Sequence, residues 1–177
     1  MAVRERDEAT FHDFVAARSA SLFRTALLVM GDHQLAQDLL QESLVKTYVA
    51  WPRLRDVSNA EGYARRVIVS TSSSWRRRRS FHERPVEALP DTVVADVADM
   101  IAGHTDLWTQ LHALPPRQRA AVVLRYCEDL SEAQTAELMG CSVGSVKRHA
   151  SHGLAKLGDR MGAQFTPPAP DDSVVTS

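Results

Sequence analysis

The amino-acid sequence predicts an all-α protein in which two small helical domains are joined by a flexible linker. The chain has 177 residues, enough for two small domains, and only 8 of them are glycine. Apolar residues recur at helical spacing before about residue 80 and again over about 105–160. Residues 81–104 lack a sustained period and contain Pro85 and Pro90, which predicts a linker with room for a short helix at 93–102.

The first domain, residues 8–80, opens with a predicted helix from about Thr10 to Met30. Gly31 follows the last apolar position, and glycine commonly stands just past a helix end. The small-residue run Ser19-Ala20-Ser21 leaves open whether this stretch is one helix or two.

A second helix is predicted over about 33–51. Asp32 is placed to cap its start and Pro52 to end it. Apolar residues share one side of this helix. The opposite side is polar and includes Asp38, Gln41 and Glu42.

A third helix should follow the capping-box pattern Ser58-Asn59-Ala60-Glu61. Its apolar stripe reaches Trp75 and runs into the four arginines Arg76–Arg79. The serine-rich residues 70–74 are mediocre helix formers, so the continuity of the helix stays open there.

The net charge of -1 hides a basic block followed by an acidic block. Residues 58–84 carry seven arginines and two glutamates, a net charge of +5. Residues 85–112 carry five acids and no lysine or arginine, a net charge of -5. This pattern predicts one segment that contacts a polyanion and a linker that does not.

The second domain, residues 105–160, contains the strongest local pattern. Ser131-Glu132-Ala133-Gln134 is another capping box, and it starts a short helix. Gly140 suits a left-handed position after that helix, and Ser142 can cap the next one. One face of this last helix carries the apolar residues Val143, Val146, Ala150, Leu154 and Leu157. Residues 131–157 thus have the pattern of a helix-turn-helix.

The outer face of the last helix is polar and basic. Its residues are Ser145, Arg148, Ser151, His152 and Lys156. In a helix-turn-helix this face enters the major groove of DNA. Arg148 is the candidate for a base-edge contact because its guanidinium fork matches guanine O6 and N7, whereas Lys147 and Lys156 are better placed for phosphates. The alternative is an ordinary helical hairpin with a solvated face.

Residues 113–157 resemble region 4 of the extracytoplasmic-function sigma factors of bacterial RNA polymerase, which belong to the sigma-70 family. The specific runs are Leu114-Pro115-Pro116-Arg117-Gln118-Arg119 and Ser142-Val143-Gly144-Ser145-Val146-Lys147. Residues 36–44 are similar to region 2.2, and residues 62–69 with 75–78 are similar to regions 2.3 and 2.4. The likeness covers about 10–160 and is nearest to the SigE-like actinobacterial group.

The resemblance implies that the chain binds core RNA polymerase and directs promoter recognition and transcription initiation. Region 2 would bind the clamp helices of the β′ subunit and the -10 element, where the loop 55–59 would capture a flipped base. Region 4 would bind the -35 element, and the β flap is a further expected contact. An anti-sigma factor is a candidate partner.

Carried over residue by residue, the resemblance assigns three contact sets. Core polymerase binding goes to Asp38, Gln41 and Glu42. Binding of the -10 element goes to Asp56, Ser58, Asn59, Arg65, Arg66, Arg76, Arg77, Arg78 and Arg79. Binding of the -35 element goes to Ser145, Lys147, Arg148, Ser151, His152 and Lys156.

Each assignment has a structural alternative. Most acidic helix faces are merely solvated, and basic residues in a last helical turn also complement the helix dipole. The chain also departs from the family pattern. The family often has Ser-Arg and Arg-Ala where this chain has Arg148-His149 and His152-Gly153, and an asparagine common in region 2.3 is Ser70 here. These departures bear on the promoter sequence and not on the fold.

The sequence has no nucleophile motif and no Gly-rich phosphate loop, so we expect neither enzyme activity nor a cofactor. Cys141, His149 and His152 are near one another in the sequence, but we interpret this as chance and expect no metal. Cys127 and Cys141 form no CxxC pair, and no apolar leader or membrane span is apparent. These features predict a reduced, cytoplasmic protein.

Two other functions fit parts of the pattern. A stand-alone helix-turn-helix transcription regulator would need a ligand or phosphoacceptor domain before residue 80. A nucleic-acid-processing enzyme would need clustered carboxylates or His/Cys ligands. The sequence offers neither. Residues 161–177, with their prolines and small polar residues, are expected to form a disordered tail.

Overall fold

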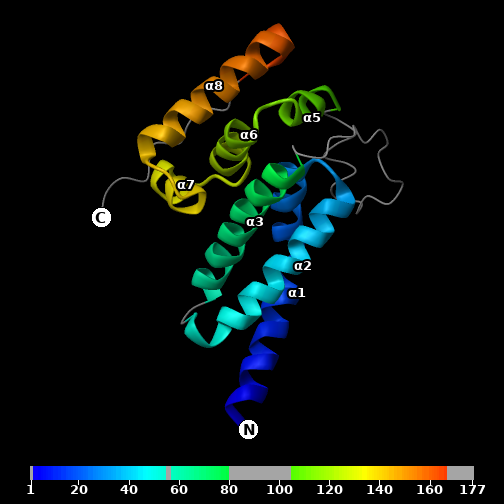
Figure 1. Cartoon of the computed structure of the whole chain (residues 1–177), viewed down its shortest axis with the longest axis vertical. Helices are drawn as coiled ribbons and strands as arrows, with labels where there is room; N and C mark the ends of the chain where they lie inside the picture. Colours follow the sequence, from blue (N-terminus) through cyan, green and yellow to red (C-terminus); the bar gives the residue numbers. More distant parts are fainter. Residues whose placement is uncertain (1, 55–56, 80–104, 167–177) are drawn as a thin grey trace. The chain divides into compact units, whose positions relative to one another are not determined.

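The structure is a computed structural model that describes residues 2–54, 57–79 and 105–166. Within these ranges the regular elements are all helical, which confirms the predicted all-α class (Figure 1). The chain divides into two compact units, Met1–Leu89 and Pro90–Ser177. The predicted linker, including the short helix at 93–102, lies outside the described residues. Over the described ranges, no helix has the length and hydropathy needed to cross a membrane.

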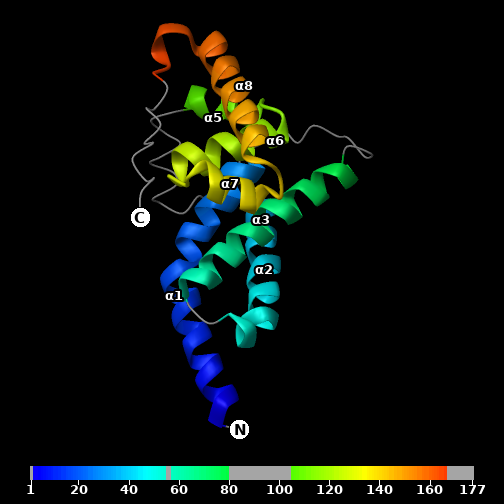
Figure 2. The same cartoon turned by 90° about the vertical axis from the view of Figure 1, so that its left-hand side faces the viewer.

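Over its described residues, 2–54 and 57–79, the first unit is a bundle of three long helices, each packed against the other two (Figures 1 and 2). They are α1 (Ala2–Met30), α2 (His33–Ala50) and α3 (Val57–Arg79), and a 3-10 turn, η1 (Trp51–Arg53), follows α2. The side chains buried between them include Phe14, Leu22, Ala26, Ala36, Leu39, Ala64 and Ile68. Burial of these apolar faces is the main force that holds the bundle together.

The junction of α1 and α2 follows the sequence prediction. α1 runs without a break through residues 19–21, where the Ser19 hydroxyl donates to the Val15 carbonyl at 2.6 Å. Gly31 then takes a positive φ of 78°, a conformation that costs glycine little. The Asp32 carboxylate accepts a hydrogen bond from the Leu35 backbone N–H at 2.8 Å and caps α2, as predicted.

The start of α3 differs from the prediction. The helix begins at Val57, so Ser58 lies inside its first turn and is not the residue before it. Glu61 contacts arginine side chains, with Arg18 Nε at 3.4 Å and Arg65 Nη2 at 3.0 Å. The predicted capping box is therefore wrong, since α3 begins before the residue expected to cap it, and Glu61 instead forms one ion pair with Arg18 of α1 and one with Arg65 within α3.

The serine-rich part of α3 stays helical. The hydroxyls of Ser70, Ser72 and Ser73 donate to the carbonyls of Val67 or Val69 in the preceding turn. Such bonds satisfy the hydroxyls within the helix, so Ser72 can be buried without losing a hydrogen bond.

The described part of the second unit, residues 105–166, is built around one long helix, which packs on three shorter ones (Figure 2). In chain order the elements are α5 (Thr105–His112), α6 (Pro116–Val122), the π-helical turn η2 (Val123–Cys127), α7 (Glu132–Met139), α8 (Val143–Met161) and the 3-10 turn η3 (Gly162–Gln164). Helical structure therefore continues past residue 160, into residues that were predicted to be a disordered tail. Residues 167–177 lie outside the described part of the chain.

Two buried arginines connect segments of this unit. The Arg119 side chain donates from Nη1 to the His112 carbonyl at the end of α5, at 2.8 Å. Arg125 in η2 donates from Nη1 to the Leu130 carbonyl in the loop before α7. A positive charge at the last carbonyls of a helix interacts favourably with the helix dipole. The two side chains therefore fix how α5 and the start of the helix-turn-helix meet α6 and η2.

Candidate nucleic-acid interface

The turn of the predicted helix-turn-helix forms as the sequence indicates. The Ser131 hydroxyl accepts from the Gln134 N–H at 3.1 Å, and Gln134 Oε1 accepts from the Ser131 N–H at 2.8 Å, which completes the capping box. Gly140 is left-handed, with φ 61° and ψ 43°. The Ser142 hydroxyl accepts from the Ser145 N–H at 3.2 Å and caps α8. Local hydrogen bonds thus fix the angle at which α8 leaves α7.

The inner face of α8 matches the prediction except at its start. Val146, Ala150 and Leu157 are buried, and Leu154 is half-buried. Val143 was predicted to face inward but is 39% exposed. A helical side chain leans over the turn that precedes it, and the first residue of α8 has no such turn.

Gly153 lies on the buried face of α8, directly against α6. A Cβ atom at this position would lie 2.7 Å from Val122 Cγ2 and 3.4 Å from the Gln118 carbonyl oxygen. In the sequence, Gly153 stands out only as a departure from the family pattern. The structure shows that this glycine lets the two helices approach closely.

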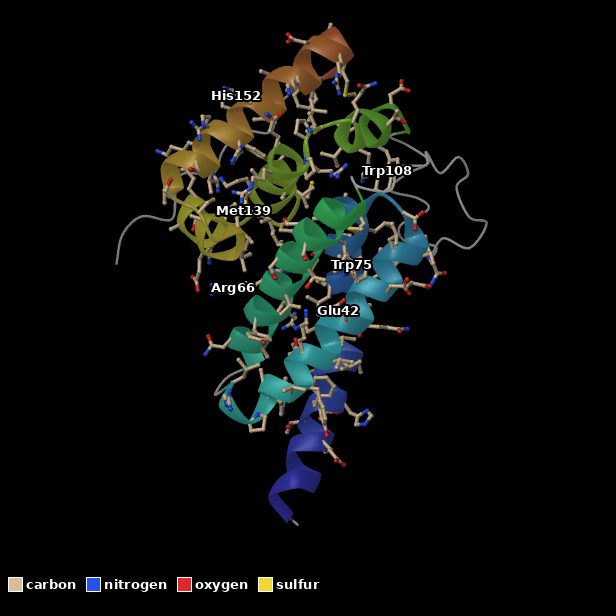
Figure 3. The ribbon with its side chains drawn as sticks, in the orientation of Figure 1. Glu42, Arg66, Trp75, Trp108, Met139 and His152 are labelled. Carbon is tan, nitrogen blue, oxygen red and sulfur yellow. The ribbon has the colours of Figure 1, made fainter. Side chains whose placement is uncertain are left out.

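The predicted DNA-facing residues of α8 differ in exposure. Lys147, Arg148, Ser151 and His152 are exposed, and His152 projects from the side of α8 away from α6 (Figure 3). The two others, Ser145 and Lys156, are half-buried. The Ser145 hydroxyl is 2.9 Å from the Ser142 hydroxyl, so it takes part in the cap. Lys147 Nζ is 3.3 Å from Glu132 Oε2 on α7.

The charge of an exposed arginine on α6 acts on a histidine of α8. Burial lowers the pKa of His149, and the nearby charges of Arg117, Arg148 and His152 lower it further. Arg117 is exposed in the first turn of α6. Arg117 was not among the sequence-predicted residues, because its effect on His149 arises from the packing of α6 against α8.

The predicted polar ridge of α2 is present and has an apolar extension. Asp38 and Gln41 are exposed and Glu42 is half-exposed. Asp38 accepts a hydrogen bond from Gln34 at 3.2 Å, and Glu42 accepts one from Lys46 at 2.6 Å. The next turns of α2 expose three large side chains: Val45 at 63%, Tyr48 at 46% and Val49 at 74%.

These apolar residues were not among the sequence-predicted site residues. Val45 and Val49 stand seven and eleven positions after Asp38, which places all three on the same side of the helix. Their spacing could have identified them, since exposed valines break the apolar-in, polar-out pattern of a bundle helix. A mixed polar and apolar strip of this kind is typical of a surface that binds another protein.

The structure gives the two arginines in the middle of α3 different surroundings. Arg66 is exposed. Arg65 is mostly buried, with its guanidinium 3.0 Å from Glu61 and 3.4 Å from the Ser21 hydroxyl on α1. Arg65 therefore connects α3 to α1, which leaves Arg66 as the more accessible of the pair.

The remaining predicted -10 residues are only partly described. Asn59 is exposed in the first turn of α3, and Arg76–Arg79 form the end of that helix. Asp56 lies outside the described residues, and the side chains of Ser58 and of Arg76–Arg79 are not described.

A hollow of about 260 Å³ lies between α2 and α3. It is lined by Glu42, Lys46, Ser70, Thr71, Ser74 and Trp75 (Figure 3). Lys46 Nζ is 3.4 Å from Thr71 Oγ1, so the ammonium group reaches across from α2 to α3. An indole and hydroxyls are groups that can hold an unstacked nucleobase. The one cation, Lys46, is already paired with Glu42 Oε1 at 2.6 Å. The sequence did not reveal this hollow, because its walls come from two helices.

Comparison with known proteins places both units in the same family. The model of sigma-70 region 2 matches residues 14–82, and the model of sigma-70 region 4 matches residues 104–157. The solved structure of the sigma factor RpoE in complex with the anti-sigma factor NepR from Bartonella quintana matches with a TM-score of 0.69 at 18% identity. The match covers 88% of this chain and 99% of that chain, and it shows similarity of fold.

Sequence relatives support the same assignment. The chain is 39% identical to the RNA polymerase sigma-E factor of Streptomyces avermitilis over 151 residues, which is 85% of this chain and 84% of the relative. It is 37% identical to the sigma-E factor of Streptomyces coelicolor, with 87% of each chain covered. It is 27% identical to the extracytoplasmic-function sigma factor SigM of Mycobacterium tuberculosis, with 88% and 79% covered. The chain therefore belongs to the extracytoplasmic-function sigma factors of the sigma-70 family.

Proposed function

We propose that this protein binds core RNA polymerase in the bacterial cytoplasm and directs it to promoters, without catalysing a reaction of its own. The observation that carries the proposal is the pairing of two family regions on one chain, each with an exposed surface suited to its role. The first unit offers the mixed strip on α2. The second offers a helix-turn-helix whose outer face is basic.

The core-binding surface is proposed to be the strip formed by Asp38, Gln41, Glu42, Val45 and Val49. The polar end would orient this protein on the polymerase and make their binding depend on salt. The two valines would become buried on binding. We therefore expect the valines to contribute to affinity alongside the carboxylates.

The test is a pull-down of core polymerase by charge-reversed full-length protein. Asp38→Lys should weaken binding by more than about tenfold, because like charges across an interface cost several kcal/mol. The matched control is Asp13→Lys, which makes the same reversal at an exposed position on α1. Equal affinities for Asp38→Lys and the unchanged protein would contradict the assignment.

Contact with the -10 element is proposed to run along α3. Asn59 and the loop before it would hold a flipped base, Arg66 and Arg76–Arg79 would neutralise phosphates, and the hollow beside Trp75 would accept a second unstacked base. Arg65 is proposed to have a structural role: its ion pair with Glu61 stabilises the helix that carries these DNA contacts.

Contact with the -35 element is proposed to run along α8. Arg148 would read a guanine, and Lys147 and Lys156 would hold phosphates. Ser151 and His152 share the outer face and would line the same groove, and Ser145 would contact DNA only next to the cap.

Promoter variants test these roles at several salt concentrations. Arg148→Ala in the holoenzyme should cost about 1–3 kcal/mol and relax the preference at one base pair. Lys147→Ala should weaken all sequences equally and flatten the salt dependence. If Arg148→Ala lowers affinity equally for every -35 variant, Arg148 is a phosphate contact and not a reader.

We also propose an anti-sigma factor as a competing partner for the strip on α2. The reason is physical: Val45, Tyr48 and Val49 are exposed in the free chain, and such residues favour a covering partner. A partner of this kind, captured from the native bacterium, should be displaced by core polymerase. If the partner and core polymerase bind this protein at the same time, the partner's binding site must lie outside the strip on α2.

The alternative function is a stand-alone helix-turn-helix regulator. The three-helix bundle of the first unit, with its exposed strip on α2, favours the polymerase-bound role. The two functions differ in one measurable respect: a regulator binds its DNA site specifically without polymerase, whereas this protein should need core polymerase for specific binding.

A further inference from the structure

The Lys147 ammonium, one of the proposed phosphate contacts, is already next to a carboxylate of the same chain. Lys147 Nζ lies 3.3 Å from Glu132 Oε2. Glu132 is the first residue of α7, and Lys147 stands in the first turns of α8. The ion pair therefore bridges the two helices of the helix-turn-helix on the side of α8 that carries the DNA-facing residues.

A DNA phosphate and the Glu132 carboxylate are competing anions for one cation. The Lys147 side chain is 62% exposed and that of Glu132 is 32% exposed, so solvent and DNA can reach the pair. When a phosphate takes Lys147, the carboxylate loses its partner and lies close to the approaching phosphate. Two like charges in this position repel each other.

We infer that Glu132 acts as an internal competitor of DNA, which lowers the affinity of the helix-turn-helix for any phosphate backbone without affecting base readout. The inference rests on the proposed phosphate contact of Lys147. Its consequence is that the free protein binds DNA about two- to fivefold more weakly than it would without this carboxylate.

Glu132 can be substituted without removing any hydrogen bond of the helix cap. The helix cap is formed by Ser131 and Gln134 and does not include Glu132. Glu132→Gln therefore removes the charge and keeps both the cap and the side-chain length. Glu137→Gln is the matched control, since it removes one charge from an exposed position on the same helix.

The experiment is a set of fluorescence anisotropy titrations of the full-length chain against a labelled mixed-sequence DNA duplex, over a series of salt concentrations. Glu132→Gln should raise affinity about two- to fivefold at low salt, the range expected for an exposed ion pair. It should also steepen the slope of log affinity against log salt by up to about 0.9, because the carboxylate no longer offsets the charge that Lys147 presents to the phosphate.

The decisive comparison uses a second variant, Lys147→Gln, which already lacks the cation of the ion pair. In that background Glu132→Gln should have no more effect than Glu137→Gln, whereas in the unchanged chain its effect should be clearly larger. If Glu132→Gln acts equally with and without Lys147, the inference is overturned, and the charge acts only through the general field of the protein. If Lys147→Gln itself changes neither affinity nor salt slope, the proposed phosphate contact is also wrong.

Discussion

The contact between α6 and α8 at Gly153 supports a quantitative prediction. In Gly153→Ala the new methyl carbon would lie 2.7 Å from Val122 Cγ2, well inside the favourable carbon–carbon distance of about 3.5–4.0 Å. Val122 is 5% exposed, and a β-branched side chain in a helix has one strongly preferred rotamer. The valine therefore cannot move aside without strain.

Two opposing effects set the size of the change. Overpacking a core costs about 1–3 kcal/mol, and alanine is a better helix former than glycine by about 1 kcal/mol. We expect Gly153→Ala to lower the free energy of unfolding of the second unit by about 1 kcal/mol. In a Val122→Ala background the clash is absent, so the same substitution should raise the free energy of unfolding by about 1 kcal/mol.

The assay is native-state hydrogen exchange in the full-length chain, read at the amides of α6 and α8, which reports the opening free energy of this unit alone. The sign reversal between the two backgrounds is the diagnostic result. If Gly153→Ala is stabilising by the same amount in both, α6 and α8 do not approach as closely as described, and the position of α8 on its domain must be reconsidered.

Three further predictions concern other features of the chain. Arg125→Met leaves the Leu130 carbonyl without its guanidinium donor, so it should cost about 1–3 kcal/mol in urea denaturation of the full-length chain. Because the pKa of His149 is lowered below 6.5 in the folded state, the unfolded chain binds more protons between the two values. Stability should therefore fall as the pH drops below 6.5, and His149→Gln should abolish that part of the fall in thermal melts at several pH values. Trp75→Ala should weaken the hold of the holoenzyme on single-stranded -10 DNA by about 1–3 kcal/mol and leave duplex binding unchanged, as measured by competition with single-stranded oligonucleotides.

Features set by local chemistry were predicted correctly from the sequence. The caps at Asp32, Ser131 and Ser142 and the left-handed Gly140 depend on residues a few positions apart, so their side-chain types suffice to place them. The apolar stripe of α8 was likewise readable from its period, except at Val143, where the helix begins.

Features that depend on the packing of separate helices were missed. Nothing local indicates that Arg65 reaches Ser21 of α1, or that the charge of Arg117 on α6 acts on His149 of α8. The same limit explains why the hollow between α2 and α3 was not foreseen. The cap predicted at Ser58 was wrong for a different reason: the residues around it have a capping pattern, but α3 begins one residue earlier, at Val57.

If this chain gives core RNA polymerase its promoter specificity, it must change where transcription starts. The most direct measurement is transcription of genomic DNA of the source bacterium by core polymerase with and without the protein, followed by sequencing of the transcript 5′ ends. We expect start sites that appear only with the protein and share two upstream elements, one of which loses its preference at one base pair with Arg148→Ala. Transcripts whose start sites are the same with and without the protein would contradict this expectation.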